Sequence, residues 1–331
     1  MALISGRAVR RTAWRRARAV KHSRRIGARD GGVPPPGRGD RLLRTARAVL
    51  LALGFFGLCL VLVPIQCVVL ALRLEGPDRL PVLFHRLFCR MLGVRIHVRG
   101  EIAQGGPLLL TANHSSYLDI PVMGSLAPMS FIAKRQVRDW PLFGLLAALQ
   151  RSVFVDRDNR GKAAEDITQI RARLAAGETL VLFPEGTSND GNKVLPFKSA
   201  LIGAVHYRGQ ADPAEPVVKV QPLSVAYTRL QGLPMGRAFR PAVAWYGDME
   251  LIPHMWGVFR QGPIDVEIEF HEPVALDAFA SRKALAAYAQ AVVAEGVARS
   301  LSGRQPKLPR PVPAEPAPAV TTATPEPAGT A

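Results

Sequence analysis

The sequence contains few cysteines, and their number and positions exclude whole classes of protein. Three occur among 331 residues, and two of them, Cys59 and Cys67, lie inside a long apolar run. A disulfide-held scaffold or a zinc site needs more cysteines at repeated short spacings. The Gly-x-Ser-x-Gly elbow of serine hydrolases is also absent. The cysteines are therefore expected to be small apolar residues in reducing surroundings, and no metal site is expected.

Acidic residues are scarce in the N-terminal segment, which is strongly basic. Residues 1–47 hold 14 Arg or Lys against Asp30 and Asp40, which gives +12 of the total formal charge of +17. Such a segment binds nucleic acid or anionic lipid, or it marks the cytoplasmic side of a membrane segment. We expect a disordered basic arm over residues 1–40 and a disordered tail, rich in Pro and Ala, over residues 303–331.

Formal charge is absent from the 25 residues 48–72. A helix of this length crosses a bilayer core of about 30 Å at about 1.5 Å per residue. Pro64 and Gln66 interrupt the run, which leaves a kinked or re-entrant helix open beside a simple crossing, with a buried core helix as the alternative. We predict that residues 41–99 anchor the protein in the membrane. Within them, residues 80–94 are expected to form an amphipathic helix that lies on the membrane or packs against the domain.

Short apolar segments alternate with helical patterns over residues 100–302, the expected catalytic domain. One helix is expected between residues 159 and 177, and an Ala-rich helix over residues 276–301. The alternation indicates an α/β fold, a mixed sheet flanked by helices, in which chemistry lies at strand ends. The segments that read as strands are 107–112, 130–134, 152–156, 179–183, 217–227 and 264–270.

A polar sequence, NHSSYLD, follows the first of these strands directly. On one regular helix, His114 and Asp119 would point about 140° apart and would not meet. If the strand ends at Ala112 and a helix begins near Ser116, Asp119 in the first turn can reach back to the imidazole. An imidazole oriented by a carboxylate is a general base. The alternative is that His114 caps the helix and Asp119 neutralises it.

Two further loops carry polar groups after apolar strands, in PEGTSNDGNKVLPFKSA and in VFVDRDNRGK. Cations beside glycine-containing turns can hold anionic headgroups, although surface ion pairing is the alternative for each arginine alone. The polar residues of these loops are Glu185, Thr187, Lys193, Lys198, Asp156, Arg157 and Arg160.

Together these motifs resemble the glycerolipid acyltransferase family, which includes the lysophosphatidate acyltransferases, over about residues 100–227. Four motifs in the family's order make the resemblance specific. They are Asn-His-x4-Asp, matched by Asn113, His114 and Asp119; a strand closing in Asp-Arg, matched by Phe154–Arg157; Phe-Pro-Glu-Gly-Thr, matched by Phe183–Thr187; and an apolar strand with an internal Pro, matched by VQPLSVAY.

The resemblance implies direct acyl transfer to a lysolipid hydroxyl, without a cofactor beyond the acyl thioester. Carried over, His114 deprotonates the hydroxyl and Asp119 orients His114. The implied partners are membrane lipids and acyl carrier protein or coenzyme A, which carries the acyl group. The residues expected to bind the substrate are Asn113, Arg157, Glu185, Gly186, Thr187, Ser188 and Lys198.

One departure from the family pattern concerns the acceptor. Phosphatidate-forming members usually have Arg after the third motif, whereas this chain has Ser188 and Asn189. Lys193 or Arg157 could replace the missing cation as a phosphate partner. We take lysophosphatidate, which gives phosphatidic acid, as the first expectation for the acceptor. Lyso-ornithine lipid is the second, because enzymes resembling lyso-ornithine lipid acyltransferases have Ser at this point.

Two other functions explain less of the sequence. A serine hydrolase using Ser115 or Ser116 is disfavoured, because a serine beside His114 in the chain cannot readily present its Oγ to that imidazole. A membrane-tethered nucleic-acid binder would leave the four motifs unexplained, so no nucleic-acid partner is expected. Deleting residues 1–40 should leave an enzyme's chemistry intact.

The expected location follows from where the substrates are. Lysolipids reside in the bilayer, whereas acyl thioesters are soluble in the cytosol, and the basic arm should stay on the cytoplasmic side. We therefore expect an enzyme of the bacterial inner membrane with its active site facing the cytoplasm. Since a single crossing would strand the domain outside, residues 48–72 are expected not to pass straight through.

Overall fold

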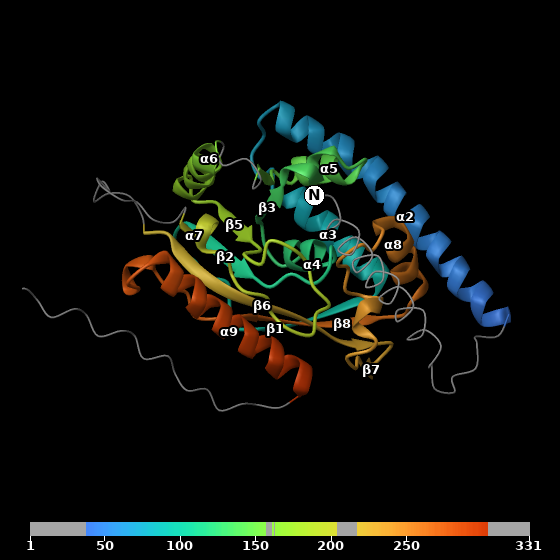
Figure 1. Ribbon diagram of the computed structural model, residues 1–331. Coiled ribbons are helices and arrows are strands. Elements are labelled where there is room, and N and C mark those ends of the chain that lie inside the picture. Colours follow the sequence, from blue (N-terminus) through green and yellow to red (C-terminus); the bar gives the residue numbers. More distant parts are fainter. Residues whose placement is uncertain (1–37, 157–160, 162, 204–216, 304–331) are drawn as a thin grey trace, which may run out of the picture. The chain divides into compact units, whose positions relative to one another are not determined.

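The computed structural model describes residues 38–156, 161, 163–203 and 217–303 (Figure 1). The chain divides into two compact units, Met1–Ala46 and Arg47–Ala331, and all described strands belong to the second. The predicted basic arm and C-terminal tail lie almost wholly outside the described residues. Arg157 and Arg160 lie outside them as well.

The described strands form one mixed sheet in the order β1-β8-β6-β2-β5-β3-β4, with β7 paired to β6. β7 and β8 run antiparallel to β6, while the other neighbours are parallel. The predicted α/β fold with a mixed sheet is therefore confirmed. The strands are β1 (Val94–Arg99), β2 (Leu108–Ala112), β3 (Ser130–Lys134), β4 (Val153–Val155), β5 (Thr179–Leu182), β6 (Lys219–Leu230), β7 (Leu233–Pro234) and β8 (Ile264–Phe270).

The six predicted strands correspond to β2, β3, β4, β5, β6 and β8, with small shifts at their ends. The prediction missed β1 and β7. In β1, apolar residues alternate with Arg and His, which is a half-buried strand pattern. It was missed because Val94 also continues the helical pattern of the preceding segment, and β7 is only two residues long.

Helices cover both faces of the sheet (Figure 1). One core lies between the sheet and α2 from Arg47 onward, together with α3, α4, α5 and α8. The other core holds α6, α7 and α9, including Ile170 and Leu174 of α6. The helices are α2 (Arg38–Ala71), α3 (Arg79–Leu92), α4 (Asp119–Gly124), α5 (Phe143–Leu149), α6 (Ala163–Ala175), α7 (Ser199–Ile202), α8 (Leu251–Arg260) and α9 (Arg282–Ser302).

Two helix predictions need correction, and three helices were missed. α4 begins at Asp119 and not near Ser116, because the residues before it form a loop held by the Asp119 carboxylate. The closing helix begins at Arg282, where Ser281 caps it by accepting a hydrogen bond from the Ala284 amide, and Leu276–Ala278 form a separate 3-10 turn. α5, α7 and α8 were not predicted.

The long apolar helix α2 buries one stripe and exposes the other. Ala48, Phe55, Cys59 and Gln66 are buried against the catalytic unit, whereas Leu60 is 77% exposed. Among the described helices, only residues Gly39–Ala71 are long and apolar enough to cross a membrane. α3, the predicted amphipathic helix, packs its apolar side into the core, which is the second of the two alternatives considered for it.

The register of the sheet brings two loops together at one edge. Thr111 of β2 pairs with Leu182 of β5, and Ala112 pairs with Leu223 of β6. Because β2 and β5 are parallel neighbours, the residues that follow Ala112 and Leu182 emerge side by side. NHSSYLD and the Phe-Pro-Glu-Gly-Thr motif therefore meet, as expected for a site at strand ends.

Candidate active site

The His114 imidazole is oriented by a carboxylate. Its Nδ1 lies 2.8 Å from Asp119 Oδ2, so Nδ1 carries the proton and its N–H donates a hydrogen bond to the carboxylate. The opposite nitrogen, Nε2, is left as an acceptor. His114 keeps 20% of its side chain exposed and lines a cavity. The predicted contact between His114 and Asp119 is therefore present, with the geometry required of a general base.

Asp119 is fully buried and accepts four hydrogen bonds. Its Oδ2 also accepts from the backbone amides of Ser115 at 2.9 Å and Ser116 at 3.0 Å, and Oδ1 accepts from the Tyr227 hydroxyl at 2.8 Å. As the first residue of α4, the carboxylate also lies at the positive end of the helix. A carboxylate held this way cannot turn away from the imidazole.

Asn113 holds the loop to the sheet. Its side-chain amide donates to the Val225 carbonyl at 2.9 Å and accepts from the Val225 amide at 2.8 Å. The side chain is buried and directed at β6, which differs from the expected contact with substrate. Asn113 therefore has a positioning role: its side chain takes the place of a backbone partner of Val225 and so fixes the position of the neighbouring His114.

Glu185 holds the backbone of His114 from the other side. Its Oε1 accepts from the His114 amide at 3.2 Å, and Oε2 accepts from the Asn189 side chain at 2.6 Å. The Asn189 amide in turn donates to the His114 carbonyl at 3.1 Å. Burial raises the pKa of Glu185 to about 7, although hydrogen bonds from Asn189, His114 and Leu195 act in the opposite direction.

Asn189 was not predicted as a site residue. The only sequence signal for it is its place in a polar loop, Ser-Asn-Asp-Gly, where Asn commonly bonds the backbone two residues on. Here its Oδ1 accepts from the Gly191 amide at 2.7 Å. Tyr227 closes the fourth motif, but its contact with Asp119 was not predicted, because the two residues meet only through the sheet.

The two serines beside His114 are not arranged as nucleophiles. Ser116 Oγ donates to the Val243 carbonyl at 2.7 Å, and the Ser115 carbonyl accepts from the Trp245 amide at 2.8 Å. Both serines are buried. Elsewhere, Ser224 Oγ lies 2.7 Å from His271 Nε2, but Ser224 is buried and bonds the Val293 carbonyl, so that pair joins β6 to α9.

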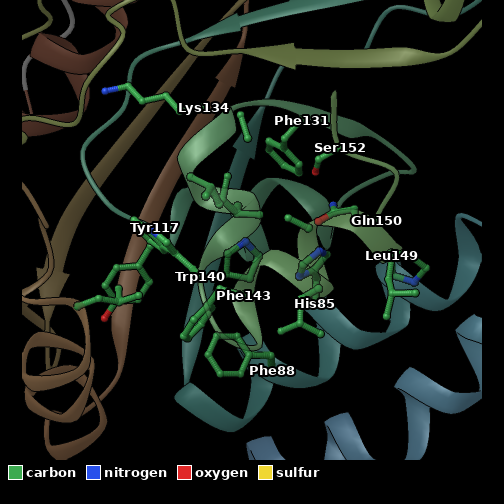
Figure 2. A pocket seen from close by; sticks show the side chains of 18 of the residues that line it. His85, Phe88, Tyr117, Phe131, Lys134, Trp140, Phe143, Leu149, Gln150 and Ser152 are labelled. Carbon is green, nitrogen blue, oxygen red and sulfur yellow. The ribbon is translucent and has the colours of Figure 1, made fainter. Parts of the chain in front are cut away.

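A largely apolar cavity of about 510 Å³ opens beside His114 and runs between the helices of one layer. Phe183 stacks on the His114 ring with centroids 4.1 Å apart and forms part of its wall. Figure 2 shows aromatic side chains around the cavity and Lys134, from the end of β3, beside it. Further lining residues are Phe55, Leu62, Phe84, His85, Phe88, Tyr117, Trp140, Phe143, Leu146, Gln150, Trp245, Leu251 and Met255.

The predicted substrate-binding residues are only partly brought together. Gly186, Thr187 and Ser188 line the cavity next to His114, and Gly186 has the positive φ of 75° that this turn requires. Lys198 is exposed and does not line it. Lys134 lines it but was missed, because a lysine ending a strand usually reads as solvent-facing. Among the described residues, no group of three or more His, Cys, Asp or Glu could hold a metal ion.

The geometry agrees with what comparison to known proteins gives. A family model described as Acyltransferase matches residues 93–224. The lyso-ornithine lipid O-acyltransferase of Brucella abortus is 48% identical over 80% of this chain and 98% of its own length. The enzyme of that name from Rhizobium meliloti is 42% identical over 85% and 95%.

A solved structure gives the same result for the fold. The crystal structure of the 1-acyl-sn-glycerophosphate acyltransferase from Thermotoga maritima matches with a TM-score of 0.53 and 26% identity. The match covers 80% of this chain and all of that one. With its matched family model and two relatives covered over nearly their full length, the chain belongs to the acyltransferase family and is a lipid O-acyltransferase.

Proposed function

We propose that the protein is a lyso-ornithine lipid O-acyltransferase, which moves a fatty acyl group from an acyl thioester to the hydroxyl of lyso-ornithine lipid. The observation that carries this proposal is the similarity to two enzymes of that name over nearly their whole length. Ser188 beside His114 supports it, because the loop offers a neutral hydroxyl where a phosphate site would gain from Arg.

The chemistry needs His114 with its partner Asp119 and the two substrates. His114 Nε2 takes the proton of the acceptor hydroxyl while Asp119 stabilises the resulting imidazolium. The oxygen attacks the thioester carbonyl, a C–O bond forms and the C–S bond breaks. The imidazolium then returns the proton to the departing thiolate, so His114 ends the cycle neutral. The acyl carrier is acyl carrier protein or coenzyme A.

The cavity suits the acyl chain. Its wall is dominated by aromatic and aliphatic side chains, and its volume lies within the usual range of roughly 300 to 1,000 Å³ for small-molecule sites. The reacting carbonyl would lie at the His114 end. The headgroup would then meet Thr187, Ser188 and Lys134, with the Lys134 ammonium available to the ornithine carboxylate.

Lysophosphatidate is the second candidate acceptor. The fold match to an enzyme of that title supports it, and Lys134 could also hold a phosphate. Purified protein given one labelled acyl carrier protein and a panel of lysolipids separates the two. Transfer to lyso-ornithine lipid at ten or more times the rate for lysophosphatidate supports the proposal, and the reverse preference refutes it.

The two stripes of α2 support a proposal for how the protein meets the membrane. Buried contacts hold the helix on the catalytic unit from Ala48 to Gln66, and Gln66 donates to the carbonyls of Pro77 and Leu149. A helix so attached would enter one leaflet by its outer stripe instead of crossing. We place the enzyme on the cytoplasmic face of the inner membrane. Cysteines introduced near Arg10 and after Ser302 should then be labelled from the same side.

A further inference from the structure

Helix α8 presents apolar side chains on two neighbouring faces, about 100° apart around its axis. On the inner side, Leu251 and Met255 line the cavity beside His114, and His254 contacts the Tyr117 hydroxyl at 3.3 Å. On the outer side, Ile252 is 59% exposed and Trp256 is 37% exposed, and neither lines the cavity. These two residues are four positions apart and therefore share one helix face, which we call the α8 outer face.

The outer face belongs to a helix that is firmly fixed. Val258 and Phe259 are buried in the core, and His254 and Gln261 contact the carbonyls of Pro241 and Ala242. Because the backbone of α8 is already ordered, covering these side chains costs only part of their own rotamer freedom. A mobile segment would have to be ordered first.

α8 adjoins the helix whose outer stripe is proposed to enter the membrane. The Arg47 guanidinium of α2 donates to the Phe259 carbonyl near the end of α8, and Phe259 packs on Phe88 of α3 with centroids 6.4 Å apart. Figure 1 shows α8 beside α2. Next to Arg47, the α2 residues Leu50 and Leu53 are 68% and 64% exposed.

The chemistry of the outer face fits a lipid surface better than an acidic carrier protein. α8 carries no formally charged side chain before Arg260, its final residue, so it offers little to carboxylates. Trp, with its apolar rings and one polar N–H, is the side chain enriched where hydrocarbon meets headgroups. A pair of Ile and Trp on an amphipathic helix suits insertion to the depth of the headgroup boundary.

We propose that the α8 outer face is a second lipid-binding surface, so that one helix separates the bilayer from the catalytic cavity. The lysolipid then passes from the leaflet around α8 to His114 without leaving the lipid phase. Passage of the acceptor rests on the proposed lipid acyltransfer, whereas contact of α8 with lipid is independent of which acceptor is used.

The contact is tested by an environment-sensitive fluorophore on Ile252→Cys, in a full-length protein whose exposed Cys67 is replaced by Ser. Vesicles of phosphatidylethanolamine and phosphatidylglycerol should shift the emission to the blue and protect the probe from an aqueous quencher. The matched controls are Val98→Cys on strand β1, which should not respond, and Leu53→Cys on α2, which should. A response at Leu53→Cys with none at Ile252→Cys overturns the proposal.

Passage of the acceptor is tested by Ile252→Asn/Trp256→Gln. Polar replacement of two inserted apolar side chains should raise the apparent KM for vesicle-borne lysolipid by about tenfold and leave kcat within about twofold. Activity on a short-chain, water-soluble acceptor should not change, which also shows that the variant folds. An unchanged KM for vesicles overturns the route.

Two further results distinguish lipid binding by α8 from binding of the acyl carrier protein and from failure of the proposed function. If acidic acyl carrier protein shifts the Ile252→Cys probe and vesicles do not, the surface binds the carrier and the proposal is wrong. If vesicles shift the probe but no lysolipid is acylated, the lipid contact stands and the proposed function fails.

Discussion

Replacing Asn189 by Ala tests whether the loop of the third motif positions the base. The Asn189 side chain donates to the buried Glu185 carboxylate at 2.6 Å and accepts from Gly191 at 2.7 Å. Both bonds disappear in Asn189→Ala. The backbone bond from Asn189 to the His114 carbonyl remains possible but loses its support.

The size of the effect follows from the two bonds lost. A hydrogen bond to a charged group contributes about 1.5 to 3 kcal/mol and a neutral one about 0.5 to 1.5 kcal/mol. We therefore expect the free energy of unfolding to fall by about 2 to 4 kcal/mol. Because His114 is displaced while the cavity is unchanged, kcat should fall about tenfold or more with little change in KM.

Exchanging the two groups supplies the matched control. In Glu185→Gln/Asn189→Asp, an amide and a carboxylate still face each other, so the pair can re-form its hydrogen bond with reversed polarity. Glu185→Gln alone places the Gln amide N–H against that of Asn189, and Asn189→Asp alone places two carboxylates together. The double variant should recover most of the lost stability and kcat. Urea unfolding in detergent and steady-state kinetics measure both quantities. A change of less than about 0.5 kcal/mol in Asn189→Ala, or no rescue in the double variant, refutes the positioning role.

Three further predictions concern the base, the acceptor and pH. His114→Ala should lower the rate of transfer by about 10² to 10⁴ with folding intact, and activity within about tenfold of wild type would contradict its role as the base. Ser188→Arg should raise the preference for lysophosphatidate over lyso-ornithine lipid by about 1.5 to 3 kcal/mol if residue 188 reads the headgroup, and an unchanged ratio of kcat/KM values would show that it does not. The folded pKa of Glu185, about 7, lies above its usual value of 4.5, so the folded state binds the proton more tightly. Its contribution to stability should therefore fall by about 3 kcal/mol as pH rises from about 4.5 to about 7, and Glu185→Gln should remove that slope from the unfolding free energy.

Local sequence was sufficient for the central features of the site. The strand ending at Ala112 and the acidic residue opening a helix indicated that His114 and Asp119 can meet, and they do, although the helix begins at Asp119 itself. A continuous apolar strand and an N-terminal carboxylate are properties of a few consecutive residues, so they can be recognised without the rest of the chain.

The features that were missed depend on distant residues. Tyr227 meets Asp119 across 108 positions, and Lys134 reaches the cavity only because β3 is a neighbour of β5. α8 was missed because its sequence, LIPHMWGVFR, is short and carries both Pro and Gly, which read as breaks in a helical pattern. The roles of Asn113 and Glu185 differ from expectation for the same reason, since only the fold shows which face of each motif is turned inward.

Arg47, the last cation before the apolar run, binds the ends of two helices of the catalytic unit. Its guanidinium donates to the carbonyl of Leu92, the last residue of α3, at 2.8 Å and to that of Phe259 in the last turn of α8. One cation thus neutralises the negative ends of two helices whose final carbonyls have no partner within the helix. Shortened proteins that begin at residue 41 keep this cation. Those that begin at residue 48 lose it, so the partial negative charges at the ends of α3 and α8 lie close together with no cation between them. Arg47 therefore ties the start of the catalytic unit to the ends of α3 and α8.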